Sequence, residues 1–463
     1  MPELPEVETV RRELLLSIQG KKIEHVTLLR EKNVKANPRD FKAALERAII
    51  QDVQRKGKCL RFDLDNGYSF YSHLRMEGKY FLRQQGAPFD KFDLLIIDFT
   101  DGSSLRYNDV RKFGTFHLGL TKDAEVDGPF SEIGPEPFDL SGKELKEAFS
   151  KRNIPVKVAL LDQPVISGIG NIYDSEILFA TKIDPMTKAN ALTLAQCDAI
   201  IQESKRILAK AIEAGGTTIK SFHHGDNIDG MFQLELQVYG KQGQPCPECG
   251  HPIKRVFLGG RSSYYCPFCQ RQPQTKFVLG ITGPIHAGKT TAANYFKAKG
   301  YLHFDADAVT HSLYEIKSVQ KKISSILGKE AFVEGKMNAG YIRSALTRSK
   351  AKKKALENYL YPLVKAKAER FIAKAPNGSK ILMDVPLLFP SHIDTLCTYT
   401  MLIDAPLEQR VERLEHEGRP TASLIQLNKE YPLEQAKKKA DYIVMNDDDV
   451  GTFLNRLHSC NLD

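Results

Sequence analysis

Four of the eight cysteines stand in two close pairs, and their spacing predicts a metal site. Two residues separate Cys246 from Cys249, and the same gap separates Cys266 from Cys269. Four thiolates on two tight turns suit one tetrahedral Zn²⁺ ion. Redox dithiols or a chance arrangement are the alternatives. A closed site of four thiolates has no open position for a substrate, so we expect a structural zinc.

A second pattern, G-x4-G-K-[ST], begins at Gly283, directly after an apolar segment and before TTAANYFKAKG. In this context backbone N–H groups and the start of a helix bind phosphate oxygens, a lysine neutralises charge and a threonine can hold Mg²⁺. The pattern therefore predicts binding of ATP with Mg²⁺. The predicted ATP-binding residues are Gly283, Pro284, Ile285, His286, Ala287, Gly288, Lys289, Thr290 and Thr291.

The first three residues offer a third kind of chemistry. After removal of Met1, the secondary amine of Pro2 would be free to attack a sugar aldehyde carbon and form a charged iminium. The adjacent Glu3 could serve as general acid and base, and Lys58 could supply another proton. Taken alone, MPELPEVE fits the start of a helix equally well, so both interpretations stay open at this point.

Four consecutive parts must position these residues. Residues 1–130 alternate apolar and polar side chains around Asn66-Gly67 and around Asp101-Gly102. That pattern predicts two hairpins, and an N-terminal helix precedes them, so we expect a β-sandwich capped by a helix. Residues 131–235 are predicted to be helical, with the glycine-rich turn ISGIGN entering one helix.

The two remaining parts hold the cysteines and the phosphate-binding pattern. Residues 236–271 form the predicted zinc finger, whose VFLGGRSSYY hairpin carries Arg261 at its tip. Residues 277–463 alternate short apolar strands with helical stretches, which favours an α/β domain with a parallel sheet.

Composition narrows the class of protein. The chain has 463 residues, 42% of them hydrophobic and 27% charged, which excludes a mainly disordered or collagen-like chain. No window of about 18 apolar residues suggests a membrane span, and the acidic start lacks the features of a secretory signal. We expect a cytoplasmic protein without membrane association. Its net charge of +9 is compatible with a polyanionic partner.

Seven motifs in residues 1–271 resemble the formamidopyrimidine-DNA glycosylase family: MPELPEVETVRREL, KGK, HLRMEGKY, YNDVRKFGTF, GIGNIY, LQVYGKQGQPCPECG and GGRSSYYCPFCQ. The resemblance implies a β-sandwich, a helix–two-turns–helix domain and a zinc finger. It also implies a base-excision repair enzyme acting on double-stranded DNA. Such an enzyme removes oxidised purines, such as 8-oxoguanine and formamidopyrimidines, and cleaves the abasic strand by β,δ-elimination.

The resemblance assigns four roles in that chemistry. Pro2 matches the Schiff-base nucleophile and Glu3 the general acid/base. Lys58 matches the proton donor for β-elimination, and Arg261 the donor for δ-elimination.

The resemblance also assigns DNA contacts. Met76, Arg111 and Phe113 match three intercalating residues that fill the space left by an extruded base. Further contacts, chiefly to phosphates, are implied at Lys157, Asn171 and Arg261, with additional ones at His73, Lys151 and Arg152.

The second part resembles the dephospho-CoA kinase family in FDADAVTHSLY, LENYLYPLVKAK, MDVPLLF and KKKADYIVMND. That resemblance implies ATP-dependent phosphorylation of the ribose 3′-hydroxyl of dephospho-CoA. Asp305 matches the expected base for this hydroxyl. Asp307 and Asp384 are neighbouring acids that we expect to be structural or linked to Mg²⁺.

Several positions depart from the kinase pattern. Pro284, His286 and Ala287 replace Gly, Gly and Ser in the loop, which restricts a backbone that must approach phosphate closely. The remaining differences are a His replaced by Tyr361, an acid replaced by Pro390, and a lid with Gln426 and Glu430 in which Arg413 and Arg419 are the candidate cations.

Two interpretations of the whole chain follow. The first is a fusion of two independent enzymes, acting as a monomer on damaged DNA and on ATP with dephospho-CoA. The second is a DNA glycosylase carrying a degenerate, non-catalytic nucleotide-binding module.

Overall fold

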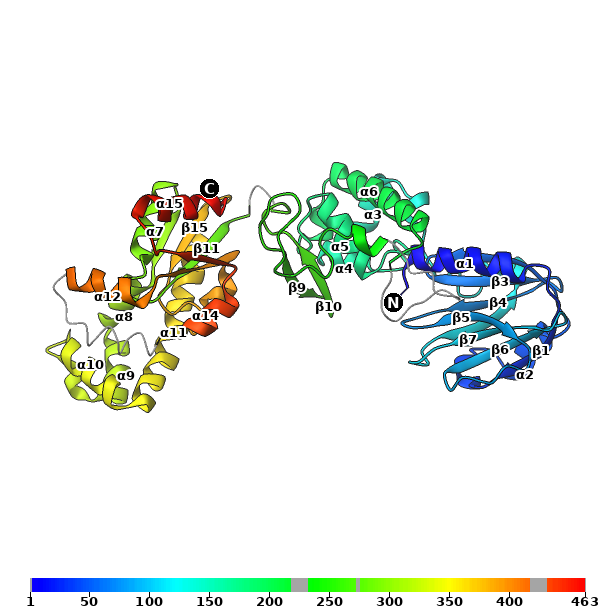
Figure 1. The fold of residues 1–463 in the computed structure, drawn as a ribbon, viewed down its shortest axis with the longest axis horizontal. Helices are drawn as coiled ribbons and strands as arrows, with labels where there is room; N and C mark the ends of the chain where they lie inside the picture. Colours follow the sequence, from blue (N-terminus) through cyan, green and yellow to red (C-terminus); the bar gives the residue numbers. More distant parts are fainter. Residues whose placement is uncertain (1, 218–231, 272–274, 417–430, 463) are drawn as a thin grey trace. The chain divides into compact units, whose positions relative to one another are not determined.

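The computed structural model describes residues 2–217, 232–271, 275–416 and 431–462. The chain divides into two compact units, residues 1–271 and residues 272–463, each with its own core (Figure 1).

The first unit begins with a β-sandwich of two antiparallel sheets. One sheet has the order β1-β6-β7-β5, formed by Ile23–Leu28, Asp93–Phe99, Ser103–Asn108 and Lys79–Gln84. The other has the order β2-β3-β4-β8, formed by Ile50–Lys56, Cys59–Leu64, Tyr68–His73 and Thr115–Leu120. Their apolar faces share one core with helices α1 (Leu4–Ile18) and α2 (Pro38–Leu45).

Both predicted hairpins are confirmed. β3 and β4 are joined at Asn66-Gly67, and β6 and β7 at Asp101-Gly102. Gly67 and Gly102 take φ angles of 83° and 84°, the left-handed backbone that these turns require and that glycine adopts without strain.

A helical part follows the sandwich and has a second core. It contains α3 (Gly142–Phe149), α4 (Val156–Leu160), α5 (Asn171–Ala180) and α6 (Leu194–Glu213). Leu4, the first residue of α1, is buried in this second core, so the start of α1 joins the two parts. The unit ends in the hairpin of β9 (Lys254–Leu258) and β10 (Arg261–Tyr265).

The second unit contains a five-stranded parallel sheet of order β12-β15-β11-β16-β17. These strands are Leu302–Asp305, Lys380–Asp384, Phe277–Thr282, Tyr399–Asp404 and Tyr442–Met445. Every residue of β11 and β16 is buried, as expected for central strands covered on both faces. The predicted fold class, with a parallel α/β kinase fold after the zinc finger, is confirmed.

Helices surround this sheet and extend beyond it. They are α7 (Lys289–Ala298), α8 (Ala306–Tyr314), α9 (Lys317–Leu327), α10 (Ala339–Arg348), α11 (Lys350–Lys374), α12 (Leu407–His416), α14 (Leu433–Lys439) and α15 (Val450–Ser459). A small hairpin, β13 (Phe332–Val333) with β14 (Lys336–Met337), lies between α9 and α10 in the chain. Among the helices of the described residues, none has the length and apolar character needed to cross a lipid bilayer.

Candidate active sites

The carboxylate of Glu3 lies against the start of α5. Its oxygens accept the N–H groups of Gly170 at 2.8 Å, Ile172 at 2.9 Å and Tyr173 at 3.3 Å. The side chain is buried, and this burial raises the pKa of Glu3, an effect that the Lys58 ammonium opposes. A buried carboxyl group with a raised pKa is suited to accept and return a proton near neutral pH.

Two glycines allow this close approach of α1 to α5. A Cβ atom on Gly170 would lie 2.3 Å from Cδ of Glu3, and one on Gly168 would lie 2.5 Å from Cδ1 of Leu4. Gly168 also has a φ of 88° and accepts the Leu4 N–H at 3.0 Å. The N-terminal segment therefore packs directly against the backbone of the GIGN motif.

Lys58 lies at the turn between β2 and β3, and its Nζ donates to the carbonyl oxygen of Ile169 at 2.7 Å. Burial lowers the pKa of Lys58 and the Arg261 guanidinium lowers it further, while the charge of Glu3 opposes both effects. The structure thus brings Glu3, Lys58 and Arg261 into one electrostatic neighbourhood. A buried ammonium of this kind releases its proton more readily than a solvated one.

Pro2 is buried, and the residue that fixes its surroundings is one that we did not identify from the sequence. The Glu3 N–H donates to Oε2 of Glu6 at 2.9 Å. Oε1 of Glu6 accepts the Tyr173 hydroxyl at 2.7 Å and the Thr217 N–H at 2.8 Å. The E-x-x-E spacing, typical of a helix N-terminus, was the available signal for Glu6.

Arg261 begins β10, directly after the left-handed turn at Gly259 and Gly260. A Cβ atom on Gly259 would lie 3.0 Å from Cγ2 of Val158, so the tip of the hairpin rests on α4. This contact explains how the finger places an exposed arginine close enough to influence Lys58.

The four paired cysteines form a cluster with the geometry of a zinc site. All four Sγ atoms lie within 4.8 Å of one another. The Sγ atoms of Cys249 and Cys266 are 3.4 Å apart, and those of Cys246 and Cys269 are 3.9 Å apart. Tetrahedral Zn–S bonds of about 2.3 Å place sulfurs about 3.8 Å apart, so the donor set fits Zn²⁺. The site is a structural zinc site.

The loops that carry Met76 and Phe113 meet at one tyrosine. A Cβ atom on Gly78 would lie 2.0 Å from the Tyr107 hydroxyl oxygen, and one on Gly114 would lie 1.9 Å from it. This buried hydroxyl donates to the carbonyl oxygen of Leu74 at 3.4 Å. Both glycines are therefore required for the two loops to close on Tyr107.

The second of these loops is folded around Asp109, which is fully buried. Its carboxylate accepts the N–H groups of Arg111 at 3.0 Å, Phe113 at 2.8 Å and Gly114 at 2.8 Å. Phe113 is 55% exposed, and the Arg111 guanidinium lies 5.3 Å from its ring centre. An exposed aromatic ring on a stiff loop is suited to enter a base stack. Sequence reasoning did not identify Asp109.

Lys157 is placed beneath the start of α5 and away from solvent. Its Nζ lies 2.6 Å from a carboxylate oxygen of Asp174, and both side chains are completely buried. Burial raises the pKa of Asp174 to about 7. Nζ also donates to the Asn171 carbonyl oxygen at 3.3 Å. The structure therefore gives Lys157 a role in supporting Asn171, which is itself partly exposed, and its contact with phosphate stays a prediction.

His73 lines a cavity of about 550 Å³ together with Lys58. Its Nδ1 accepts the Arg75 N–H at 3.0 Å, so the ring hydrogen is on Nε2. Burial lowers the pKa of His73 to about 3, which keeps the imidazole neutral. Arg152 pairs with Asp162 at 2.6 Å, and neither Arg152 nor Lys151 is among the described residues that line this cavity.

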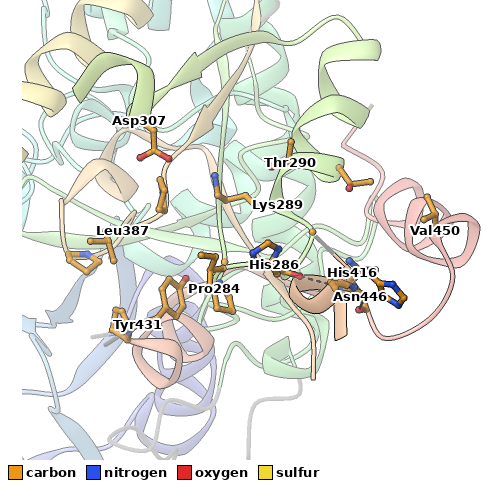
Figure 2. A pocket seen from close by; sticks show the side chains of 18 of the residues that line it. Pro284, His286, Lys289, Thr290, Asp307, Leu387, His416, Tyr431, Asn446 and Val450 are labelled. Atoms are coloured by element: carbon orange, nitrogen blue, oxygen red, sulfur yellow. Dashed lines mark hydrogen bonds between the residues drawn. The ribbon is translucent and has the colours of Figure 1, made fainter. Parts of the chain in front are cut away.

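The phosphate-binding loop of the second unit borders a cavity of about 1230 Å³ (Figure 2). A Cβ atom on Gly288 would lie 2.2 Å from Nδ2 of Asn446, which donates to the Ala287 carbonyl oxygen at 2.9 Å. His286 occupies the left-handed region at φ 60°, and Nη1 of Arg413 donates to its carbonyl oxygen at 3.1 Å. Asn446 and Arg413 thus hold the loop in shape although two of its expected glycines are replaced, by Pro284 and His286.

Lys289 faces this cavity and forms an ion pair with Asp384 at the end of β15. Nε2 of His303 lies 3.5 Å from the other carboxylate oxygen of Asp384. The charge of Lys289 is therefore compensated by Asp384. Of the candidate lid residues, Arg419, Gln426 and Glu430 lie outside the described residues.

The structure places Asp305 at the N-terminal end of α8. Its Oδ1 accepts the N–H groups of Asp307 at 2.9 Å and Ala308 at 3.0 Å, so this carboxylate caps α8. Asp307 instead lines the cavity and points toward the same space as Lys289 (Figure 2). Burial raises the pKa of Asp307, and Lys289 opposes this effect. Asp305 is not among the described residues that line this cavity, so Asp307 is the acid nearer to it, and the choice of base stays a prediction.

Helix α11 also contributes to the lining of the cavity. Lys353, Glu357 and Tyr361 line it at intervals of four residues, which places them on one face of the helix. Burial, together with Glu357, raises the pKa of Tyr361. Tyr431 also lines the cavity, and its hydroxyl lies 3.0 Å from Oγ1 of Thr282. The volume leaves room for a second substrate beside a nucleotide.

Family models match in four consecutive segments. Residues 1–116 match the formamidopyrimidine-DNA glycosylase N-terminal domain, and residues 133–223 match its H2TH domain. Residues 243–272 match a zinc finger found in FPG and IleRS, and residues 277–451 match dephospho-CoA kinase.

Individual proteins are similar to the first unit. The chain is 45% identical over 276 residues to a formamidopyrimidine-DNA glycosylase of Bacillus licheniformis, which covers 59% of this chain and 100% of that protein. A complex of Lactococcus lactis Fpg with abasic-site DNA matches at a TM-score of 0.55 and 39% identity. A structure of MutM with carbocyclic 8-oxo-G DNA matches at 0.55 and 41%. Each of the two covers 58% of this chain and 100% of the matched chain.

Proposed function

Because the chain belongs to the formamidopyrimidine-DNA glycosylase family and also carries a dephospho-CoA kinase domain, we propose that it combines two specific reactions. The first unit removes oxidised purines from double-stranded DNA and cleaves the abasic strand by β,δ-elimination. The second unit transfers phosphate from ATP to the 3′-hydroxyl of dephospho-CoA.

The proposal for the first reaction rests on the buried carboxylate of Glu3, which lies near Lys58 and Arg261. The amine of Pro2, freed by loss of Met1, attacks the sugar C1′ as the bond to the damaged base breaks. Glu3 moves the protons that ring opening and iminium formation require. Lys58 then donates a proton during β-elimination, and Arg261 assists departure of the second phosphate.

The first reaction is tested by trapping. Borohydride should reduce the iminium and link wild-type protein covalently to an 8-oxoguanine duplex, and Pro2→Gly should give no adduct. Pro5→Ala, in the first turn of α1, is the matched control and should still be trapped. Trapping that survives in Pro2→Gly would transfer the nucleophile to another amine. An unmodified duplex and a duplex with a preformed abasic site separate base excision from strand cleavage.

The proposal for the second reaction rests on the loop 283–291 and on one cavity that both Lys289 and Asp307 face. Thr290 is suited to hold the Mg²⁺ of Mg–ATP, which supplies charge stabilisation when bound. Lys289 neutralises charge on the transferring phosphate, and Asp307 accepts the proton of the ribose hydroxyl.

Two asparagine variants test the second reaction. Asp307→Asn should abolish transfer of labelled phosphate to dephospho-CoA while the affinity for ATP is kept. Asp305→Asn should retain most of the turnover, because asparagine also caps helices well. The reverse order would restore Asp305 as the base. Normal binding of ATP by wild-type protein without any transfer would favour the degenerate, non-catalytic module instead.

Other expectations from the sequence stay predictions. These are the boundaries at residues 130, 235 and 271, the monomeric state and the cytoplasmic location.

A further inference from the structure

The positive charge of the chain is concentrated in the unit that does not contain the glycosylase site. Residues 1–271 have 38 lysines and arginines against 36 aspartates and glutamates, a net charge of +2. Residues 272–463 have 28 against 21, a net charge of +7.

All of this excess comes from one stretch, residues 317–354, which we call the basic segment; the rest of the unit has a net charge of −2. It holds eleven basic and two acidic side chains, so its net charge of +9 equals that of the entire chain. It comprises α9, α10 and the start of α11, which pack against one another. Figure 1 shows α9 and α10 lying together at one end of this unit. Nine of the eleven basic side chains are exposed.

In the parts of the chain that the structure describes, the exposed cations of the basic segment are not paired with acids. None of its nine exposed cations forms an ion pair with an acid in the described parts of the chain. Moreover, α11 begins with Lys350, Lys352 and Lys353 and has no acid in its first turn. Lysines at this positive end of a helix are unfavourable, so the arrangement opposes local stability. Such a local conflict is typical of a surface retained for binding.

The nucleotide site does not account for this surface. Of the eleven basic residues, only Lys353 lines the cavity beside the phosphate-binding loop. A lipid surface also fits poorly, because Val319, Ile323 and Leu327 of α9 are buried in the core of the unit. The helix therefore has no free apolar face to insert among lipids. An extended, fully hydrated polyanion fits better.

We propose that the basic segment binds the phosphate backbone of duplex DNA and thereby contributes to the DNA affinity of the whole chain. Because the chain belongs to a DNA glycosylase family, DNA is the polyanion that we expect this surface to contact. Seven of the nine exposed cations are lysines, which act as point charges toward phosphate and read no base edges. The contact is therefore independent of sequence and of damage.

The test uses the full-length protein, with Lys317, Lys321 and Lys322 on α9 all changed to glutamine. Binding to an undamaged duplex is measured over a range of salt concentrations. Loss of three phosphate contacts should lower the slope of log K against log salt by about 2–3 and weaken binding by about tenfold or more at low salt. The matched control changes Lys367, Arg370 and Lys374, three exposed cations on the C-terminal half of α11, and should have a much smaller effect.

Further readouts separate the possible results. Thermal unfolding and phosphate transfer to dephospho-CoA should be unchanged in the α9 variant. An unchanged salt slope would overturn the proposal. So would an equal loss in the control variant, which would indicate overall charge and not this surface. A raised KM for dephospho-CoA without loss of DNA affinity would assign the lysines to the kinase substrate. Stronger loss of binding to anionic vesicles than to duplex would assign them to a membrane.

Discussion

At the scale of single residues, the site depends on close approaches that only glycine permits. The carboxylate of Glu3 reaches three N–H groups at the start of α5 because Gly170 has no side chain. The loops of Met76 and Phe113 use Gly78 and Gly114 in the same way.

A single methyl group at Gly170 should therefore disable base excision. In Gly170→Ala the new Cβ meets Glu3 Cδ at 2.3 Å, so the carboxylate must move by about an ångström. Displacement on this scale costs about 100-fold in rate, and overpacking costs about 1–3 kcal/mol of stability. Single-turnover excision of 8-oxoguanine measures the effect. Gly119→Ala on β8, where the nearest atom is 3.4 Å away, should behave as wild type.

Burial of His73 should make the first unit sensitive to acid. The folded pKa of about 3 lies below the ordinary value of 6.5, so the unfolded chain binds the proton more readily. Stability from this group is complete above pH 6.5 and is lost as pH falls toward 3, by about 2–4 kcal/mol. Denaturant unfolding of His73→Gln should show a smaller acid loss than wild type. His25→Gln, whose side chain is 59% exposed, is the control and should follow wild type.

Sequence patterns pointed to the residues that we propose carry the chemistry better than to those that hold them in place. Motifs indicated Pro2, Glu3, Lys58 and Arg261 as candidates, but they did not indicate Glu6 and Asp109. Asp109 accepts backbone N–H groups of its own loop, and Glu6 accepts that of the distant Thr217. The sequence does not show which backbone groups a carboxylate reaches, so only the E-x-x-E spacing offered a signal, and only for Glu6. Asp305 shows the same limit, since its capping role became visible only with α8 in place.

At the scale of elements, the hairpin of β9 and β10 in the zinc finger holds Arg261 in position. The sulfur cluster anchors β9 and β10, and Gly259 rests on Val158 of α4. A short hairpin has little stability alone, because its hydrophobic core is small. Binding of the metal therefore supplies the free energy that stabilises this hairpin.

Removal of the zinc should thus affect only the first unit. Cys249→Ser or treatment with a chelator should weaken DNA binding and stop strand nicking, because Arg261 loses its support. Affinity of the second unit for ATP should stay the same. Cys460→Ser, in the second unit and outside the sulfur cluster, is the control. A parallel loss of ATP affinity in Cys249→Ser would contradict this assignment.

The substituted phosphate-binding loop should be strained at one position. A side chain at φ 60° costs about 1–2 kcal/mol, so His286→Gly should stabilise the second unit by about 0.5–1 kcal/mol after the greater freedom of unfolded glycine is counted. Ala287→Gly, in the same loop but without positive φ, should destabilise it. Thermal unfolding distinguishes the two, and a drop in stability of His286→Gly would show that the histidine ring makes compensating contacts.

At the scale of the whole molecule, the chain consists of two units that each possess a core and a complete set of proposed reacting groups. The order of strands and helices followed well from the sequence, because apolar periodicity and turn residues act locally. The net charge of the whole chain, +9, did not indicate which unit carries the positive charge. The basic segment became apparent only when the two units were considered separately.

Catalysis in the two units should be separable. Lys289→Ala should abolish phosphate transfer through loss of charge stabilisation and leave excision unchanged. Glu3→Gln should stop excision and leave phosphate transfer unchanged. Both activities are measured on the same preparations. Impaired excision in a folded Lys289→Ala protein would show that the units are coupled.

The closure of two loops on the Tyr107 hydroxyl has a consequence for how damage is found. Because Gly78 and Gly114 both abut this one oxygen, the segments bearing Met76 and Phe113 cannot be displaced separately. If Met76 and Phe113 enter a duplex as proposed, we expect them to enter together. Each base pair would then be tested in one step and not in two.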